Sequence, residues 1–242
     1  MPQPLEGRVA LVTGGAKRIG RSIIEKLASE GADIVINYAS SKPDAESLAA
    51  DIRKLGRRAL AIPANVSIKQ EVQQMFQKIE GEFSRLDVLV NNAGMFSAAD
   101  FLDLTEEQWD AIMSTNLKAQ FLCAQTAAPL LKRSGHGRII NISSLGGMLP
   151  WPKFTHYCVS KAGVIMLTRC MARALAPEIL VNSVAPGTIQ FPGEDPDEEY
   201  IKRAPLHRTG KGSEIADAVF FFATTEFVTG QILAVDGGRS LT

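Results

Sequence analysis

The sequence predicts an α/β protein in which a parallel β-sheet is covered by helices on both faces. Short apolar runs alternate along the chain with longer segments whose apolar residues recur at helical spacing. The first apolar run ends in a glycine-rich turn, and no linker, repeat or low-complexity tract interrupts the alternation. Such alternation is typical of a doubly wound sheet, here of about seven strands. We therefore expect a single domain over residues 1–242.

The first strand is expected at residues 8–12, RVALV, followed by the turn TGGAKRIG and a helix. Gly14 permits a tight turn and Gly20 permits close packing, while the start of the helix directs its free amide groups at a pyrophosphate. A second strand follows at residues 33–37, at the spacing of a dinucleotide-binding unit. The turn therefore contributes five candidate cofactor-binding residues: Gly14, Lys17, Arg18, Ile19 and Gly20.

The end of the second strand favours NADP(H) as the cofactor. A site that prefers NAD places a carboxylate here to bind the ribose 2′-hydroxyl, and that charge repels a 2′-phosphate. Here the strand ends in Asn37, Tyr38, Ala39, Ser40 and Ser41, which include no acid. We expect Tyr38, Ser40 and Ser41 to contact the cofactor, with the basic residues of the glycine turn close by. If those basic residues are merely solvated, the choice between NAD and NADP stays open.

The alternation continues to the end of the chain. Strands are expected at 59–62, 87–90, 138–142, 179–184 and 231–235, and helices at 44–55, 69–83, 106–132, 156–175 and 213–223. One irregular segment, residues 187–212, is rich in proline and glycine and has an acidic cluster. It follows the carboxyl end of a strand, where open α/β sheets bind ligands, and its length suggests a substrate lid.

A catalytic group is suggested within residues 143–161, SSLGGMLPWPKFTHYCVSK. Tyr157 and Lys161 are four residues apart at the start of a predicted helix, so their side chains share one face. A nearby ammonium favours the phenolate and makes tyrosine a more effective acid or base. Ser144 follows a predicted strand and could donate its hydroxyl to a developing oxyanion. Taken alone, the pair could equally be an ordinary amphipathic pair on a helix.

Composition excludes several classes of function. Lysine plus arginine equal aspartate plus glutamate at 26 each, which gives no electrostatic reason to expect nucleic acid or an anionic membrane as a partner. There is no apolar run long enough to span a membrane and no signal-peptide core, so we expect a cytoplasmic chain. Three cysteines lack the spacing of a metal site or a disulfide framework, and no metal is expected.

Several motifs together resemble the short-chain dehydrogenase/reductase family, over essentially the whole chain. They occur in the family's order and spacing: Thr13 to Gly20, Asn91-Asn92-Ala93-Gly94, Asn116, Ser144, Tyr157 with Lys161, Pro186-Gly187, and Val235 to Gly238. The resemblance implies a Rossmann-type fold and an enzyme that transfers hydride between a nicotinamide cofactor and a small molecule. It also supports a catalytic reading of Tyr157.

The resemblance implies a role for each matching residue. Tyr157 is similar to the general acid that protonates the substrate oxygen, and Ser144 to the residue that binds that oxygen. Lys161 would lower the pKa of the tyrosine and hold the ribose of the nicotinamide, and the backbone of Asn116 would hold a water in a proton relay. The remaining matches imply contacts to the cofactor, by Asn65, Val66, Asn92, Ala93, Gly94, Pro186, Gly187, Thr188 and Ile189.

One departure from the family pattern concerns the substrate. Arg18 stands where the family usually has a glycine, as in the pteridine-reductase branch, in which this arginine reaches the cofactor phosphates and the pterin. Phe96 stands where that branch places an aromatic residue that stacks on the pterin, although it could also be a core or lid residue. Ser144 argues against the branch, which usually has an aspartate there; a serine hydroxyl suits an oxyanion better.

Three hypotheses follow. The first is an NADPH-dependent reductase of a carbonyl, either a ketone or a 3-oxoacyl group. The second is a pteridine reductase, and the third is a non-catalytic NADP-binding sensor, which would predict a damaged catalytic set. The resemblance further implies a homo-oligomer, a tetramer more readily than a dimer. Phe220, Phe221, Phe222 and Phe227 could belong to its interface or to the core.

Overall fold

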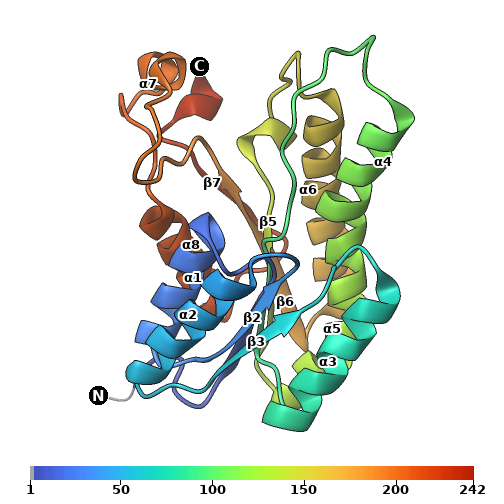
Figure 1. Ribbon diagram of the computed structural model, residues 1–242, viewed down its shortest axis with the longest axis vertical. Coiled ribbons are helices and arrows are strands. Elements are labelled where there is room, and N and C mark those ends of the chain that lie inside the picture. Colours follow the sequence, from blue (N-terminus) through green and yellow to red (C-terminus); the bar gives the residue numbers. More distant parts are fainter. Residues whose placement is uncertain (1–2) are drawn as a thin grey trace.

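The computed structural model describes residues 3–242 and contains one seven-stranded sheet in which every neighbouring pair of strands is parallel. The strand order is β3-β2-β1-β4-β5-β6-β7 (Figure 1). The bounds are β1 Val9–Val12, β2 Asp33–Tyr38, β3 Ala59–Pro63, β4 Val88–Asn91, β5 Gly137–Ile142, β6 Ile179–Pro186 and β7 Ile232–Val235. The predicted α/β class, strand number and Rossmann-type arrangement are confirmed.

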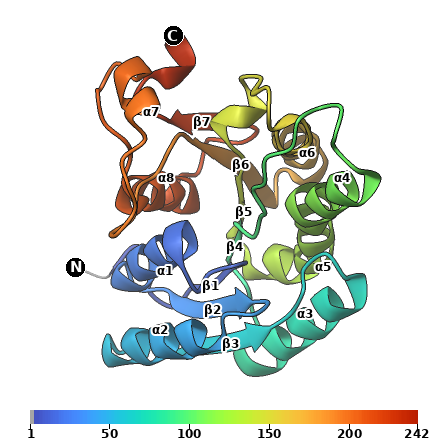
Figure 2. The same cartoon turned by 45° about the horizontal axis from the view of Figure 1, so that its top comes forward.

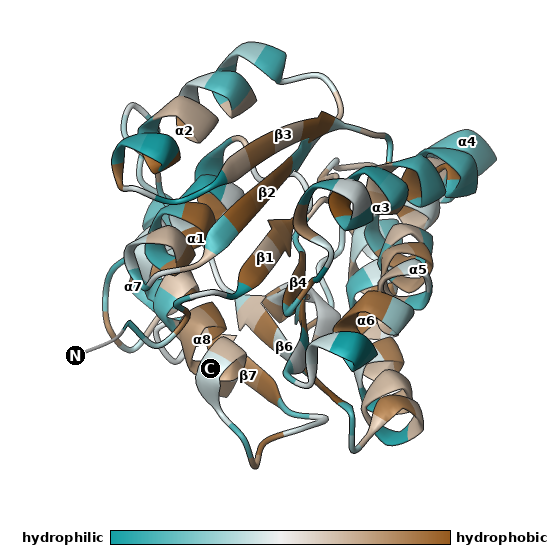
Figure 3. Cartoon of the chain, turned by 90° about the horizontal axis from the view of Figure 1, so that it is seen from below, coloured by the Kyte–Doolittle hydropathy of each residue, from teal (hydrophilic) through white to brown (hydrophobic). Residues whose placement is uncertain are grey.

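Helices cover both faces of the sheet (Figure 2). Helices α1 (Arg18–Ser29), α2 (Lys42–Lys54) and α8 (Gly212–Thr224) pack on one face, and α3 (Lys69–Phe83), α5 (Ala119–Ser134) and α6 (Thr155–Leu175) on the other. Because successive strand residues point to opposite faces, Val9 and Leu11 of β1 join one core while Ala10 and Val12 join the other. Burial on both faces explains why the strands are apolar without polar alternation (Figure 3).

The sheet has its topological switch point between β1 and β4. From β1 the chain winds outward through β2 and β3, and it then returns to place β4 on the other side of β1. In such sheets the loops at the carboxyl ends of the two central strands diverge and leave a crevice that binds ligands. The glycine turn follows β1 and the Asn92-Ala93-Gly94 segment follows β4, so both motifs meet at this crevice.

The helical region predicted at 106–132 differs from the structure in one respect. It consists of α4 (Glu106–Met113), a π-helical turn at Ser114–Lys118 and then α5. A single π turn inserts an extra residue into a helix and often marks a functional position. Here the turn contains Asn116, whose side chain is fully buried.

The segment 187–212, expected to be irregular, contains the short helix α7 (Glu198–Arg203). Asp197 caps this helix by accepting a hydrogen bond from the backbone N–H of Tyr200 at 2.9 Å. Acidic residues occupy its first turn and basic residues its last, which complements the helix dipole. Among residues 3–242, no helix combines the length and the apolar character that a membrane crossing requires.

Candidate active site

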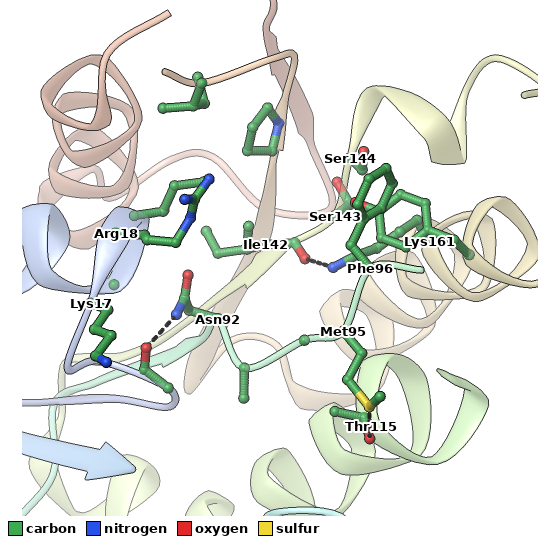
Figure 4. Close-up of a pocket in the computed structure, with 18 of the residues that line it drawn as sticks. Lys17, Arg18, Asn92, Met95, Phe96, Thr115, Ile142, Ser143, Ser144 and Lys161 are labelled. Atoms are coloured by element: carbon green, nitrogen blue, oxygen red, sulfur yellow. Dashed lines mark hydrogen bonds between the residues drawn. The ribbon is translucent and has the colours of Figure 1, made fainter. Parts of the chain in front are cut away.

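A cavity of about 1360 Å³ opens at the carboxyl ends of the central strands. It brings together the glycine turn, the end of β2, the segment after β4, the stretch 143–161 and the segment after β6. All of the candidate site residues predicted from the sequence line this cavity except Asn116. In Figure 4, Lys17 and Arg18 lie at one side of the pocket, and Ser144, Lys161 and Phe96 lie at the other.

The glycine turn packs against the segment after β4 too closely for larger residues. A Cβ atom on Gly20 would lie 2.5 Å from the Gly14 carbonyl oxygen and 2.7 Å from Nδ2 of Asn92. Asn92 Nδ2 donates to the Gly14 carbonyl at 3.0 Å, and Thr13 Oγ1 accepts from the backbone of Asn92 and Ala93 at 2.9 and 3.0 Å. These contacts fix the turn beside the amino end of α1, leaving its first amide groups directed into the cavity.

Arg18 has a left-handed backbone conformation, with φ of 52°. This conformation costs a non-glycine residue free energy, which gives the physical reason for the glycine that the family pattern places here. The Arg18 guanidinium pairs with Glu194 and lies 4.5 Å from the centre of the Phe191 ring. The arginine thus contacts the segment 187–212 in this structure, whereas the resemblance implied contacts to cofactor phosphates and to the substrate.

Lys17 also has an acidic partner. Its Nζ lies 3.0 Å from Oδ2 of Asp44, in the first turn of α2. Ser41 precedes α2 as its N-cap residue but makes no capping hydrogen bond with its side chain. Ser40, Ser41 and Lys17 all line the cavity at the end of β2, so the expected position of a ribose 2′-phosphate combines hydroxyls, an ammonium and a helix amino end.

Tyr157, Ser144 and Lys161 meet at the opposite end of the cavity. The Lys161 side chain is only 4% exposed, and Nζ donates to the Ile142 carbonyl at 2.9 Å and lies 5.8 Å from the Tyr157 ring centre (Figure 4). Ser144 Oγ accepts a hydrogen bond from the Gly146 N–H at 3.0 Å. This bond uses a lone pair of Ser144 Oγ and not its proton, so the hydroxyl can donate to an oxygen in the cavity.

Burial shifts the protonation equilibria of this group. Burial raises the pKa of the Tyr157 phenol, and a hydrogen bond with Ser144 opposes that shift. Burial also lowers the pKa of Lys161 to about 8. The lowering of the phenol pKa that the resemblance implies for Lys161 stays a prediction, because Lys161 is not among the causes of this shift. Desolvation of the phenol dominates the net shift. Near neutral pH the phenol therefore keeps its proton, the form that a general acid needs.

The Asn116 side chain is buried behind the residues that line the cavity and makes three hydrogen bonds there. Its Oδ1 accepts from the Met95 N–H at 2.7 Å, and its Nδ2 donates to the Met95 carbonyl at 3.0 Å and to Ser160 Oγ at 3.2 Å. The side chain thus ties the π turn to the segment after β4 and to α6, the helix that carries Tyr157 and Lys161. The proton relay implied for the Asn116 backbone stays a prediction.

Phe96, predicted from the sequence, forms an aromatic wall next to Tyr157 together with Trp151 and Phe154, which were not singled out. The Phe96 ring stacks on Phe154 at 4.5 Å between centres and meets Tyr157 edge to face at 4.8 Å, and the Trp151 ring lies parallel to Tyr157 at 6.0 Å. Phe96 is 61% exposed, so it is a cavity residue and not a core residue. Trp151 and Phe154 lie in the stretch 143–161, and their aromatic side chains close to Tyr157 in the sequence could have identified them as cavity residues.

Further lining residues lie between positions 191 and 203 and at position 239, where the sequence analysis assigned no role to a residue. They are Phe191, Asp197, Glu199, Tyr200, Arg203 and Arg239. Leu145 packs with Tyr200 and Ala204 in a small apolar cluster, which holds α7 against the turn that follows Ser144. The cavity therefore has a catalytic end between the aromatic wall and α7.

The residues present fit a dinucleotide. Gly20 leaves no room for a side chain where the turn approaches Asn92, the amino end of α1 presents free amide groups, and the cavity extends from the end of β2 to Lys161. The end of β2 carries hydroxyls and not a carboxylate, so it accepts a 2′-phosphate without like-charge repulsion from the strand itself. No group of three or more histidine, cysteine, aspartate or glutamate residues within 3–242 is placed to hold a metal ion.

Comparison with known proteins places the chain among oxidoreductases. A family model described as Enoyl-(Acyl carrier protein) reductase matches residues 14–240. The 3-oxoacyl-(acyl-carrier-protein) reductase FabG of Staphylococcus aureus is 42% identical over 237 residues, which cover 95% of this chain and 96% of the relative. The FabG of Thermotoga maritima is 38% identical over 242 residues, which cover 97% and 98% of the two chains.

Solved structures resemble the chain over nearly its full length. A short-chain dehydrogenase/reductase from Serratia marcescens superposes with a TM-score of 0.93 at 35% identity, covering 98% of this chain and 99% of its own. A short chain dehydrogenase from Burkholderia cenocepacia in complex with NADP has a TM-score of 0.91 at 36% identity, with the same coverage. The strand order and the cavity therefore occur in a fold that holds a nicotinamide cofactor in other proteins.

Proposed function

The chain belongs to the short-chain dehydrogenase/reductase family, and we propose that it reduces the ketone of a 3-oxoacyl thioester to an alcohol with NADPH. It is an NADP(H)-dependent oxidoreductase acting on a small molecule. The observation that carries the proposal is the convergence of the Tyr157 phenol and the Ser144 hydroxyl at the end of the cavity. Two preset donors at one oxygen suit a carbonyl that becomes an alkoxide.

We assign the chemical roles to the side chains as follows. The Ser144 hydroxyl donates to the carbonyl oxygen and orients it toward Tyr157. Tyr157 donates its proton to that oxygen as negative charge develops there. Lys161 holds a positive charge 5.8 Å from the centre of the Tyr157 ring, and it would hold the ribose hydroxyls of a bound nicotinamide. The bound NADPH supplies the hydride.

The comparisons favour a 3-oxoacyl substrate over a pterin. The curated relatives at 38–42% identity are named as 3-oxoacyl-(acyl-carrier-protein) reductases. Ser144 agrees with them, because a serine hydroxyl is too weak an acid to protonate a ring nitrogen. The description of the family model names an enoyl reductase instead. Hydride addition to a C=C bond conjugated to a thioester would place negative charge on the thioester oxygen, which two oxygen-directed donors could also bind, so the names of the relatives carry the choice of a 3-oxoacyl substrate.

Substrate choice can be tested by following NADPH oxidation with three compounds: an acetoacetyl thioester, a crotonyl thioester and dihydrobiopterin. We expect kcat/KM to be highest for the acetoacetyl thioester, by at least roughly tenfold, because both hydroxyls would act on the ketone oxygen that receives the proton. Preference for the crotonyl thioester would support enoyl reduction. Turnover of the pterin alone would contradict the proposal.

Two further features belong to this proposal. The segment 187–212 acts as a lid over the substrate, which is supported by the cavity-lining positions of Tyr200 and Arg203 in α7. The chain forms a homo-oligomer, a tetramer more readily than a dimer, which is supported by large apolar side chains exposed on α5, α6, α8 and β7: Phe121, Met166, Phe221 and Leu233. Apolar surface of this kind is typical of an interface.

A further inference from the structure

Asp44 pairs with Lys17 at the part of the cavity where we expect the 2′-phosphate that distinguishes NADPH from NADH. Its carboxylate Oδ2 is 3.0 Å from Lys17 Nζ, and Lys17 lines the cavity beside Ser40 and Ser41. Asp44 itself is not a cavity-lining residue and reaches Lys17 from the first turn of α2. We propose that Asp44 determines cofactor specificity by weakening the preference for NADPH over NADH. This inference rests on the proposed use of the cavity for a nicotinamide cofactor.

Groups that attract an anion and one carboxylate that repels it meet at this position. The Lys17 ammonium and the amino end of the thirteen-residue helix α2 attract an anion. The Asp44 carboxylate cancels much of that attraction, since it is the only acidic residue in the first turn of α2. Arg18, the other basic residue of the glycine turn, is paired with Glu194 of the segment 187–212, so its charge is already compensated.

The ion pair affects the two cofactors differently. A 2′-phosphate that binds Lys17 must either share the Lys17 ammonium with the Asp44 carboxylate or displace that carboxylate from it. In either case two anionic groups come close together. NADH has a hydroxyl in place of the phosphate, so it can bind with the Lys17–Asp44 pair intact. The carboxylate therefore imposes a penalty on NADPH that NADH does not bear.

The size of the effect follows from the exposure of the pair. The side chains of Lys17 and Asp44 are 57% and 41% exposed, so water screens their interaction and the pair is easily broken. We expect Asp44→Asn to lower the Kd for NADPH about two- to fivefold, a range typical of exposed charge pairs. The Kd for NADH should change by less than about twofold, because no phosphate is present.

The experiment measures Kd for NADPH and NADH by cofactor fluorescence, in the wild-type chain and in Asp44→Asn. Asp51→Asn is the matched control, because Asp51 lies on the same helix and pairs at 2.9 Å with Lys54, which does not line the cavity as Lys17 does. It should leave the ratio of the two Kd values unchanged. Asp44→Ser serves as a second variant if the asparagine variant folds poorly, since serine is also tolerated near a helix amino end.

A double-mutant cycle with Lys17→Met separates the two contributions of Asp44. If the carboxylate acts mainly by holding Lys17, Asp44→Asn should tighten NADPH binding less in the Lys17→Met background. An unchanged or reduced NADPH preference in Asp44→Asn would overturn the inference; a reduction would mean that Asp44 presents Lys17 to the phosphate. If the wild-type chain binds neither cofactor, the proposed function itself fails, which is a distinguishable result.

Discussion

Tyr157→Phe should lower kcat for NADPH-dependent reduction of an acetoacetyl thioester by about 100- to 10,000-fold, the range expected when a general acid is removed. The variant loses the phenol that we assign as the proton donor beside Ser144 at the end of the cavity. Phenylalanine keeps the ring that packs edge to face with Phe96 and parallel to Trp151, so the fold and the aromatic wall should be preserved. Steady-state kinetics and a fluorescence titration with NADPH measure the two effects separately.

The expected pattern is a large loss in kcat with little change in Kd for NADPH. Tyr38→Phe is the matched control, because Tyr38 lines the same cavity at the end of β2, far from the catalytic hydroxyls. Any effect should fall on the Kd for NADPH, because Tyr38 is an expected cofactor contact. At saturating NADPH, kcat should stay within about twofold, since no proton-transfer step uses this hydroxyl. If Tyr157→Phe retained more than a tenth of the wild-type kcat, the assignment of Tyr157 as the acid would be wrong.

Lys161→Met should abolish most activity and at the same time stabilise the fold. Burial lowers the pKa of Lys161 from 10.5 to about 8, so the folded state holds this charge at a free-energy cost. A shift of this size corresponds to roughly 3 kcal/mol at neutral pH. Loss of the hydrogen bond to the Ile142 carbonyl offsets about 1 kcal/mol of that gain. The net increase in Tm should be about 4–8 °C for a chain of this size.

The stabilisation should depend on pH with a defined sign. Below pH 8 the lysine is protonated in both the folded and the unfolded state, so the wild-type chain bears the full cost of burying the charge. Between pH 8 and 10.5 the folded state releases this proton before the unfolded state does, and wild-type stability gains from it. The difference in Tm between Lys161→Met and wild type should therefore shrink as pH rises through this window. A difference that grows, or a variant less stable at neutral pH, would contradict the buried-charge account.

The helix and strand pattern could be predicted from the sequence because it follows from apolar periodicity. Helix α3 has the predicted bounds, 69–83, and each strand begins and ends within about two residues of expectation, as boundary uncertainty would suggest. The π turn at Ser114–Lys118 could not be predicted, because it changes backbone hydrogen bonding without changing the apolar pattern. Helix α7 depends on local capping by Asp197 within a segment rich in turn residues.

The cavity residues could be predicted as far as they belong to motifs. The glycine turn, Ser144 and Tyr157 with Lys161 all line the cavity, as their order along the chain implied. The sequence could not reveal the partners of Lys17 and Arg18, because Asp44 and Glu194 come from other elements and are fixed by packing. Nor could it reveal the raised pKa of Tyr157, since the shift depends on how completely the neighbouring elements exclude water.

The most direct test of the central claim uses NADPH that carries deuterium at both positions of the nicotinamide C4. After reaction with an acetoacetyl thioester, mass spectrometry of the product measures where the label goes. Our account predicts a 3-hydroxybutyryl thioester with one deuterium on the former carbonyl carbon, and no such product from Tyr157→Phe at comparable times. A product without deuterium, or label on the carbon next to the thioester, would contradict direct reduction of the ketone.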